Sequence, residues 1–166
     1  MLDEERRNEP IGKTSSPQRD PNKTSVFFFW VKNGVRINPF DFVVAEHIDG
    51  SKTVGVVDEI FAYTDSDSHL TNFIGSELGE PTAQPYVDRV STMVARARVL
   101  RNMRSDDREE LYMPIPAERK VYFADENAIK SALGFDQILG ERIPGGLIKQ
   151  SNGKLTPIYL DSVYIV

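Results

Sequence analysis

Short apolar runs separated by turn residues recur along the chain. Residues 26–31 form a run of aromatic and β-branched side chains, which predicts a strand buried on both faces. Two further runs, at residues 41–46 and 53–63, flank Asp49-Gly50, a dipeptide typical of tight hairpin turns. These two runs therefore predict a β-hairpin. Gly55 within the second run predicts a bulge or a bend of the kind that a closing barrel needs.

The second half of the chain carries further strand signals. Residues 90–100 alternate between two faces, so a period of two fits them better than the helical period, and we predict a strand although Ala and Arg favour helices. Residues 121–123 start another short strand. Two runs at residues 147–150 and 155–160 flank Asn152-Gly153, which predicts a second hairpin.

Helical signals are confined to short segments. Asp125 is a good N-cap for residues 126–133, and Gly134 ends this predicted helix. Residues 64–89 are rich in turn residues and predict a long loop with one helical turn near residues 70–74. Several short strands with one short helix predict a mainly β fold, a small closed or nearly closed antiparallel β-barrel.

Residues 1–25 differ in composition from the rest of the chain. They hold Pro10, Pro17 and Pro21 and few large apolar side chains, so they cannot bury enough surface to offset the entropy lost on ordering. We therefore expect a mobile N-terminal arm over residues 1–25, with residues 11–13 as a short edge strand. A β-barrel domain over residues 26–166 follows. The expected core residues of this barrel are Phe28, Trp30, Val43 and Val56.

The charge and composition narrow the range of partners. The 166 residues carry 20 Lys and Arg against 25 Asp and Glu. This net charge of -5 repels a phosphate backbone at long range, so the overall charge gives no reason to expect binding to nucleic acid. The longest apolar run is far shorter than the about 20 residues of a membrane span, so we expect no membrane contact. The chain has no cysteine, and we expect a cytoplasmic protein. Asn22-Lys23-Thr24 matches a glycosylation acceptor, which we discount because no secretion signal precedes it.

Two fragments imitate a P-loop, whose glycine-rich turn closes backbone N–H groups around phosphates. Gly12-Lys13-Thr14 has Arg7 at the position of the first glycine, and Gly50-Ser51-Lys52-Thr53 has Ser51 at the position of the second. We expect neither fragment to bind ATP. We expect this chain to be no enzyme and to hold no cofactor, metal ion or catalytic residues.

Histidines and carboxylates offer few catalytic combinations. A metal site would have to combine His47 and His69, from two distant loops, with carboxylates such as those of Asp65 and Asp67. The adjacent Asp58-Glu59 lies in a strand pattern, where successive side chains point to opposite faces. These two carboxylates therefore cannot act as a catalytic pair, and we assign them a structural role.

Arginines supply the one local basic feature of the sequence. The cluster comprises Arg89, Arg96, Arg98, Arg101, Arg104 and Arg108. It is compatible with an ordinary solvated face, and also with contacts to phosphate or to an acidic partner through Arg96, Arg98, Arg101 and Arg104. The aromatic run at residues 27–30 lacks interleaved basic residues, so it predicts core packing rather than a platform for stacking bases.

Several segments in combination resemble a known family. They are Val54–Ile60, Met93–Leu100, Pro114–Pro116, Pro144–Leu147 and Pro157–Asp161. With them the chain resembles, over about residues 9–166, the N-terminal HAS-barrel of HerA-type ATPases in the FtsK-HerA superfamily. That barrel is similar to the small barrel crowning the ATP synthase catalytic subunits. These segments are packing patterns rather than catalytic signatures.

The resemblance implies a non-catalytic barrel attached to a hexameric, ATP-dependent translocase of double-stranded DNA. It implies a RecA-like domain after the barrel that binds ATP and Mg²⁺, and no position of this chain matches the family's ATP-binding residues. The barrels would form a collar on a homo-oligomeric ring and dock a nuclease or a sirtuin-like effector. The implied roles are DNA end processing or antiphage defence.

Two alternatives stay open. The first is a free-standing OB-like nucleic-acid-binding module that uses the Arg89–Arg108 cluster and binds in a salt-dependent way. The second is a small-ligand or metal enzyme that works through His47, His69 and the loop at residues 65–67.

Overall fold

The computed structural model describes residues 9–75, 78–80, 82, 91–103 and 113–164. The strands are β1 (Gly12–Ser15), β2 (Val26–Val31), β3 (Phe42–Glu46), β4 (Lys52–Thr64), β5 (Ser91–Met103), β6 (Lys120–Phe123), β7 (Arg142–Lys149) and β8 (Leu155–Asp161). The helices are α2 (His69–Gly75) and α3 (Glu126–Ala132), with short 3-10 turns η2 (Phe135–Gln137) and η3 (Ser162–Tyr164). No helix in these described ranges is long and apolar enough to cross a membrane.

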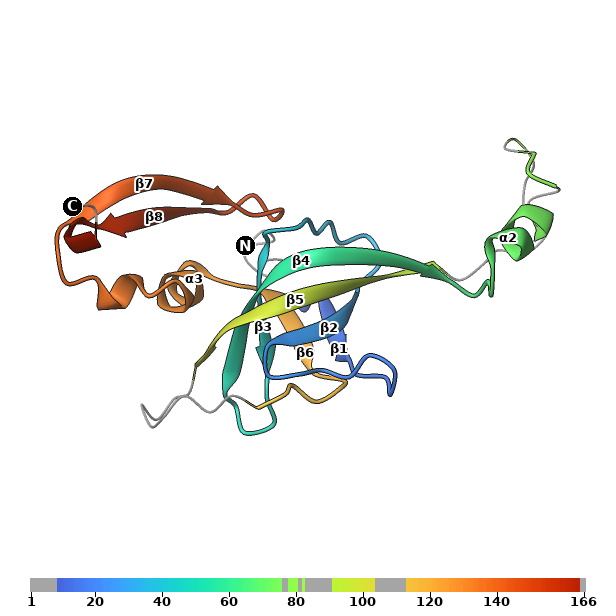
Figure 1. The fold of residues 1–166 in the computed structure, drawn as a ribbon, viewed down its shortest axis with the longest axis horizontal. Coiled ribbons are helices and arrows are strands. Elements are labelled where there is room, and N and C mark those ends of the chain that lie inside the picture. Colours follow the sequence, from blue (N-terminus) through green and yellow to red (C-terminus); the bar gives the residue numbers. More distant parts are fainter. Residues whose placement is uncertain (1–8, 76–77, 81, 83–90, 104–112, 165–166) are drawn as a thin grey trace.

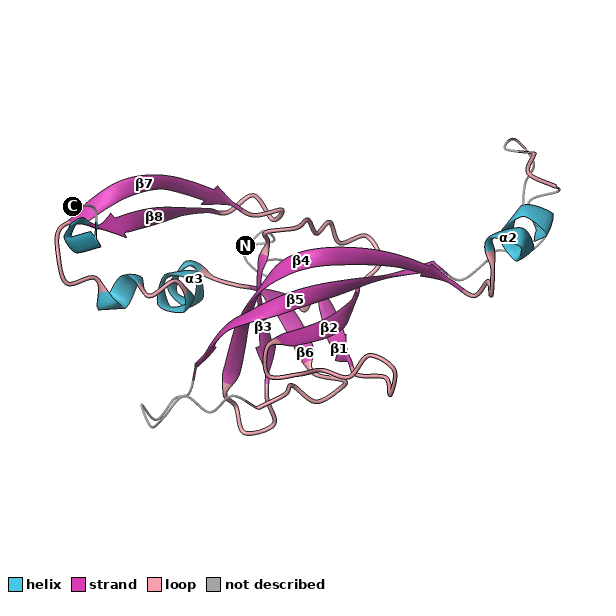
Figure 2. Ribbon diagram, in the orientation of Figure 1, coloured by secondary structure: helices cyan, strands magenta, loops and turns pink. Residues whose placement is uncertain are grey.

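Six strands close into an antiparallel barrel in the order β1-β2-β5-β4-β3-β6 (Figure 1, Figure 2). The prediction of a mainly β fold with a closed barrel is confirmed. The segment at residues 91–103 is a strand, β5, because β2 and β4 pair with it on its two sides. The hairpin around Asp49-Gly50 joins β3 to β4, and the register shifts between Val54 and Gly55, where the sequence predicts a bulge.

The barrel begins earlier than the sequence indicates. β1 pairs with both β2 and β6, so it closes the barrel within the range expected to be a mobile arm. A side chain at Gly12 would collide with the carbonyl of Trp30, so this close approach requires glycine. The buried Thr14 hydroxyl donates a hydrogen bond to the Pro116 carbonyl at 2.6 Å. The domain boundary expected at residue 25 is thus corrected, because β1 is held by backbone pairing rather than by large apolar side chains.

The barrel interior is filled by alternate residues of each strand. Phe27, Phe29 and Val43 are fully buried there. Phe28 and Trp30 are only half-buried, because they alternate with the inward residues and lie on the outer face of β2. Of the expected core residues, Val43 lies in the interior, whereas the assignment of Phe28 and Trp30 to it is wrong. Val56 also lies outside the barrel, where it packs against a second cluster.

This second cluster covers the outer face of β3 and β4. Helix α3 contributes Ala128 and Ile129 to it, and they pack with Val44 and Val54. β3 is therefore the strand buried on both faces, the property that the sequence assigned to residues 26–31. Helix α3 begins as predicted, with the Asp125 carboxylate accepting a hydrogen bond from the Ala128 amide at 2.7 Å.

A β7–β8 hairpin forms a separate two-stranded sheet beside α3 (Figure 1). Its turn is fastened to the barrel by the buried Gln150, which accepts a hydrogen bond from the Phe42 amide and donates one to the Ala124 carbonyl. The Asp41 carboxylate also accepts a hydrogen bond from the Ser151 amide at 2.8 Å. The barrel thus ends at β6, and the last part of the expected domain is an attached layer.

The two longest strands, β4 and β5, continue beyond the barrel as a two-stranded ribbon. Their pairing runs on to Thr64 opposite Ser91, whereas β2 accompanies β5 only from Met93 to Arg98. Helix α2 lies at the far end of this ribbon, well away from the barrel (Figure 1). It occupies the place where the sequence predicts a helical turn near residues 70–74.

Candidate interaction surface: a basic cleft on the barrel wall

An open cleft of about 510 Å³ lies on the outer face of the barrel. Its lining residues come from the loop before β2 and from strands β2, β4 and β5: they are Arg19, Asp20, Pro21, Lys23, Ser25, Val26, Phe28, Asp58, Arg96 and Arg98. Four of these side chains are basic and two are acidic. The cleft therefore combines an apolar floor, made by the half-buried Val26 and Phe28, with a mainly basic rim.

The loop that forms one wall of the cleft is fixed by Asn22. The Asn22 side chain is buried, donates a hydrogen bond to the Ile115 carbonyl at 2.8 Å, and accepts one from the Phe28 amide at 2.9 Å. The Asn22 amide itself donates to the Ser16 hydroxyl. Since both ends of this side chain are engaged inside the fold, Asn22 is a structural residue and not an accessible acceptor for a glycan.

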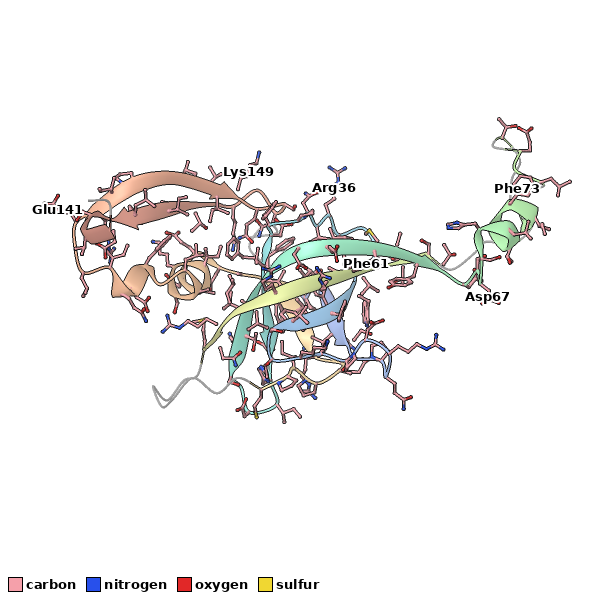
Figure 3. The ribbon with its side chains drawn as sticks, viewed as in Figure 1. Arg36, Phe61, Asp67, Phe73, Glu141 and Lys149 are labelled. Atoms are coloured by element: carbon pink, nitrogen blue, oxygen red, sulfur yellow. The ribbon has the colours of Figure 1, made fainter. Side chains whose placement is uncertain are left out.

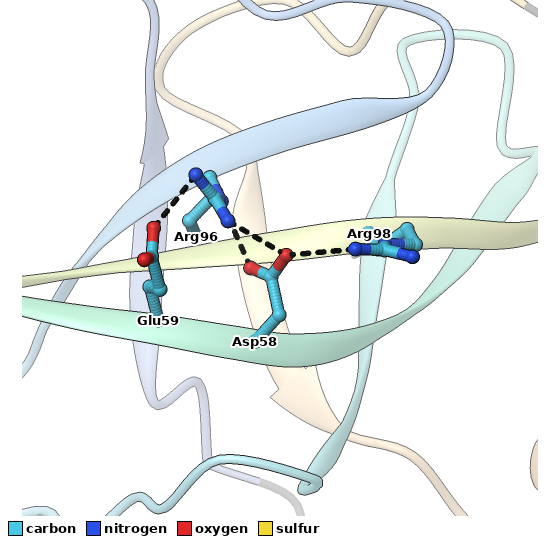
Figure 4. A network of polar contacts seen from close by, with 4 residues as sticks. All are labelled: Asp58, Glu59, Arg96 and Arg98. Carbon is cyan, nitrogen blue, oxygen red and sulfur yellow. Dashed lines mark hydrogen bonds and ion pairs between the residues drawn. The ribbon is translucent and has the colours of Figure 1, made fainter.

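The opposite wall is built on a β-bulge. Val57 pairs with Ala97 and Glu59 with Arg96, so Asp58 is an extra residue in β4. Both carboxylates then reach Arg96: Asp58 accepts two hydrogen bonds of 2.9 Å and Glu59 makes a 2.7 Å ion pair (Figure 4). The expectation that Asp58 and Glu59 point to opposite faces is wrong, because the bulge breaks the alternation. The structural role expected for these two carboxylates agrees with their hydrogen bonds and ion pair to Arg96.

The electrostatics of this wall follow from the shared carboxylate. The hydrogen bonds from Arg96 lower the pKa of Asp58 below its usual value, so Asp58 stays ionised. Arg98 also approaches Asp58, at 3.6 Å, but its side chain is 69% exposed. Arg96 is therefore largely neutralised by two acids, and Arg98, Arg19 and Lys23 give the rim its positive character.

The arginine cluster is divided by the fold. Arg96 and Arg98 line the cleft, whereas Arg101 points to the other side and donates a 2.7 Å hydrogen bond to the Ser131 carbonyl at the end of α3. The same carbonyl accepts a hydrogen bond from the Gly134 amide, and a guanidinium at this end of the helix interacts favourably with the helix dipole. Arg89, Arg104 and Arg108 lie outside the described residues. Sequence reasoning missed Arg19 and Lys23, because their segment carries no periodic signal and reads as part of a mobile arm.

The two fragments that imitate a P-loop lie in β-structure. Gly12-Lys13-Thr14 belongs to β1, where Lys13 pairs with Glu118 on the surface. Gly50-Ser51-Lys52-Thr53 forms the β3–β4 turn and the start of β4, and Lys52 lies 4.0 Å from Glu46. In both fragments the Lys and Thr that would open the helix of a phosphate loop lie in a β-strand instead.

The two histidines lie at opposite ends of β4. His47 is buried next to the β3–β4 turn, where its Nε2 donates a 2.7 Å hydrogen bond to the Thr53 hydroxyl, which in turn donates to Asn102. Burial lowers the pKa of His47, which favours the neutral ring. His69 begins α2 beyond the other end of this 13-residue strand, roughly 40 Å away at the usual rise per residue. The candidate site built from His47, His69 and residues 65–67 is therefore contradicted by the fold.

Within the described part of the chain, no group of three or more histidine, aspartate or glutamate residues has the arrangement that could hold a metal ion. The cleft is thus the feature whose chemistry the structure defines best.

No protein-family model matches this chain, and no curated protein matches it.

Proposed function

We propose that this chain is the non-catalytic N-terminal barrel of a HerA-like hexameric, ATP-dependent translocase of double-stranded DNA. In that role it serves ring assembly and docks a nuclease or a sirtuin-like effector. The closed antiparallel barrel is the architecture that the resemblance implies. In this proposal ATP and Mg²⁺ bind in a RecA-like domain that follows the barrel, and DNA is bound by the ring as a whole.

The observation that carries the proposal is the apolar surface left on two projections outside the barrel. The ribbon and α2 expose Tyr63, Leu70, Phe73, Ile74 and Leu78. The β7–β8 layer exposes Leu139, Leu147, Leu155, Leu160 and Val163. Apolar side chains gathered in this way mark surfaces that meet other proteins or domains. A closed barrel has no free strand edge onto which a partner could add a strand, which leaves the projections as the apolar surfaces available for docking.

A second candidate function is supported by the basic cleft. A free-standing OB-like module would bind nucleic acid along Arg19, Lys23 and Arg98. It is the weaker candidate, because Arg96 is already paired with Asp58 and Glu59. It predicts binding to single-stranded DNA in low salt that weakens when Arg98 is replaced by alanine. Absence of such binding removes it.

The solution mass by light scattering tests the main proposal. We would measure this chain and the longer natural polypeptide in which the proposal places it, and assay ATP hydrolysis with and without double-stranded DNA. We expect a six-subunit particle for the longer polypeptide, with hydrolysis stimulated by duplex DNA. Monomers in both preparations, or ATP hydrolysis that double-stranded DNA does not stimulate, would contradict the proposal.

A further inference from the structure

The end of the β4–β5 ribbon is acidic. From Ile60 to Val87 the sequence has no lysine and no arginine, and the described acids at this end are Asp65, Asp67 and Glu80. We call the described end of this segment, residues 63–75 with 78–80, the acidic tip. Asp67 lies at its exposed surface (Figure 3). Hydrogen bonds from Thr82 lower the pKa of Glu80, which keeps this acid ionised.

The same tip presents an apolar helix face to solvent. Leu70, Phe73 and Ile74 follow the spacing of one face of α2, yet their exposed fractions are 65%, 49% and 57%. Leu78 beside them is 69% exposed. The Gly79 amide donates a hydrogen bond to the Phe73 carbonyl, so the turn after the helix folds back onto it. An amphipathic helix normally buries such a face, and here the barrel lies too far away to cover it (Figure 1).

The cleft on the barrel wall has the complementary chemistry. Its rim carries Arg19, Lys23 and Arg98, and its floor carries the apolar side chains of Val26 and Phe28. An apolar side chain flanked by carboxylates would therefore meet apolar contacts and opposite charges together. Complementary charges of this kind fix the register of an interface and suppress wrong partners.

We propose that the acidic tip of one copy docks into the basic cleft of a second copy of this chain. The two surfaces are different parts of the molecule, so the contact is head-to-tail, and head-to-tail contacts close into rings when the rotation between copies allows it. This inference rests on the proposed ring and names the surfaces that join its subunits. The tip meets a neighbour's cleft rather than its own, because the paired ribbon extends to Thr64 and Ser91 and directs it away from its own barrel.

Disulfide trapping tests the contact in the full chain. The natural sequence has no cysteine, so each introduced thiol is the only one in its polypeptide. We would mix Leu70→Cys protein, with a thiol on the tip, and Ser25→Cys protein, with a thiol on the rim of the cleft. The control mixes Leu70→Cys with Lys149→Cys, which places the second thiol on the exposed β7 strand. All three positions are exposed, so none of these variants should lose the fold.

We expect the tip–cleft pair to form a mixed dimer about tenfold faster than the control pair or more, since docking holds the two thiols together. Adding Arg19→Glu to the Ser25→Cys chain should slow trapping, and adding Asp67→Arg to the Leu70→Cys partner should restore it. Equal rates for the tip–cleft and control pairs would overturn the inference.

Failure of the inference can be distinguished from failure of the proposed function. A six-subunit, DNA-stimulated particle without tip–cleft trapping would keep the translocase proposal and reject this contact. Trapping in a particle of another size, or in one without DNA-stimulated hydrolysis, would keep the contact and reject the translocase.

Discussion

At the scale of single residues, two neighbouring aromatic side chains of β2 contribute to different surfaces. Phe29 is fully buried in the barrel interior, beside Phe27 with a ring separation of 6.1 Å. Trp30 lies on the outer face and is half-buried. The larger side chain is therefore the less important one for the barrel, because burial rather than size decides how much apolar surface leaves water on folding.

This difference predicts losses of stability of different size for two alanine substitutions. Phe29→Ala should lower the free energy of unfolding by about 3 to 5 kcal/mol, because it leaves a cavity in a closed barrel. Trp30→Ala should cost about 1 to 2 kcal/mol, since only part of its surface is lost from contact. Urea unfolding of the two variants measures both values. A larger loss for Trp30→Ala than for Phe29→Ala would contradict this assignment of faces.

A second residue-scale prediction concerns Asp58 and pH. Arg96 holds the pKa of Asp58 below its usual value, so the ionised carboxylate stabilises the fold at pH values above the unfolded pKa of about 4. This contribution is lost as the pH falls through the lowered pKa. Asp58→Asn should cost about 1 kcal/mol at neutral pH, and the difference from the natural protein should shrink below about pH 4.

Glu126→Gln is the matched control for Asp58→Asn. Its carboxylate makes an exposed ion pair with Lys130 four residues along α3, and such pairs contribute about 0.2 to 0.5 kcal/mol. Chemical denaturation over a pH series separates the two variants. A pH-independent difference for Asp58→Asn would show that its charge has no part in stability.

The residue scale is where the sequence predicts least. The run at residues 26–31 is apolar on both faces, so alternation alone cannot say which face lies inside, and the assignment of Phe28 and Trp30 to the interior is wrong. The carboxylates of Asp58 and Glu59 are brought to one face by a bulge that no local sequence pattern marks. Arg19 and Lys23 join the cleft only because a buried Asn22 holds their loop in place.

At the scale of elements, turn and alternation signals are far more informative. Both hairpins form around the predicted Asn-Gly or Asp-Gly turns, and β5 is a strand despite its helix-forming residues. Turn geometry is local, and the two-residue alternation of β5 matches the inward Ala95 and Ala97 and the outward Arg96 and Arg98. The sequence does not predict that β1 is part of the barrel, because the place of β1 depends on backbone pairing with β2 and β6.

Gly55 allows a prediction at this scale. A Cβ there would lie 2.9 Å from both the Arg98 carbonyl oxygen and the Phe27 ring, closer than real contacts permit. Gly55→Ala should therefore destabilise the barrel by about 1 to 3 kcal/mol, because β4 and β5 must move apart where the register shifts. The change is measured as a shift in the denaturation midpoint.

Gly145→Ala is the control for Gly55→Ala. Its Cβ would lie 3.3 Å from the side chain of Leu160, which is 51% exposed and can move aside. We expect an effect within about 0.5 kcal/mol. Equal effects at the two glycines would mean that the approach of β4 to β5 at Gly55 is not a constraint on the barrel.

At the scale of the whole molecule, the parts that stabilise the fold and the parts offered to partners are separated. The barrel and α3 hold the two buried clusters, whereas the acidic tip stands at the end of a two-stranded ribbon with its apolar face in solvent. The sequence predicts a long loop at residues 64–89 but not where this loop lies. Its distance from the barrel depends on how many residues of β4 and β5 pair beyond the end of β2.

The last prediction follows from this separation. Replacing residues 65–90 by Asn-Gly would join Thr64 to Ser91, which already face each other in the ladder, through a tight hairpin turn. The barrel loses neither buried cluster, and a shorter connection lowers the entropy cost of closing the loop. The free energy of unfolding should therefore stay within about 1 kcal/mol of the natural value, while self-association measured by light scattering is lost. If the shortened chain instead unfolds in milder urea and still associates, the ribbon supports the barrel and the subunit contact lies elsewhere.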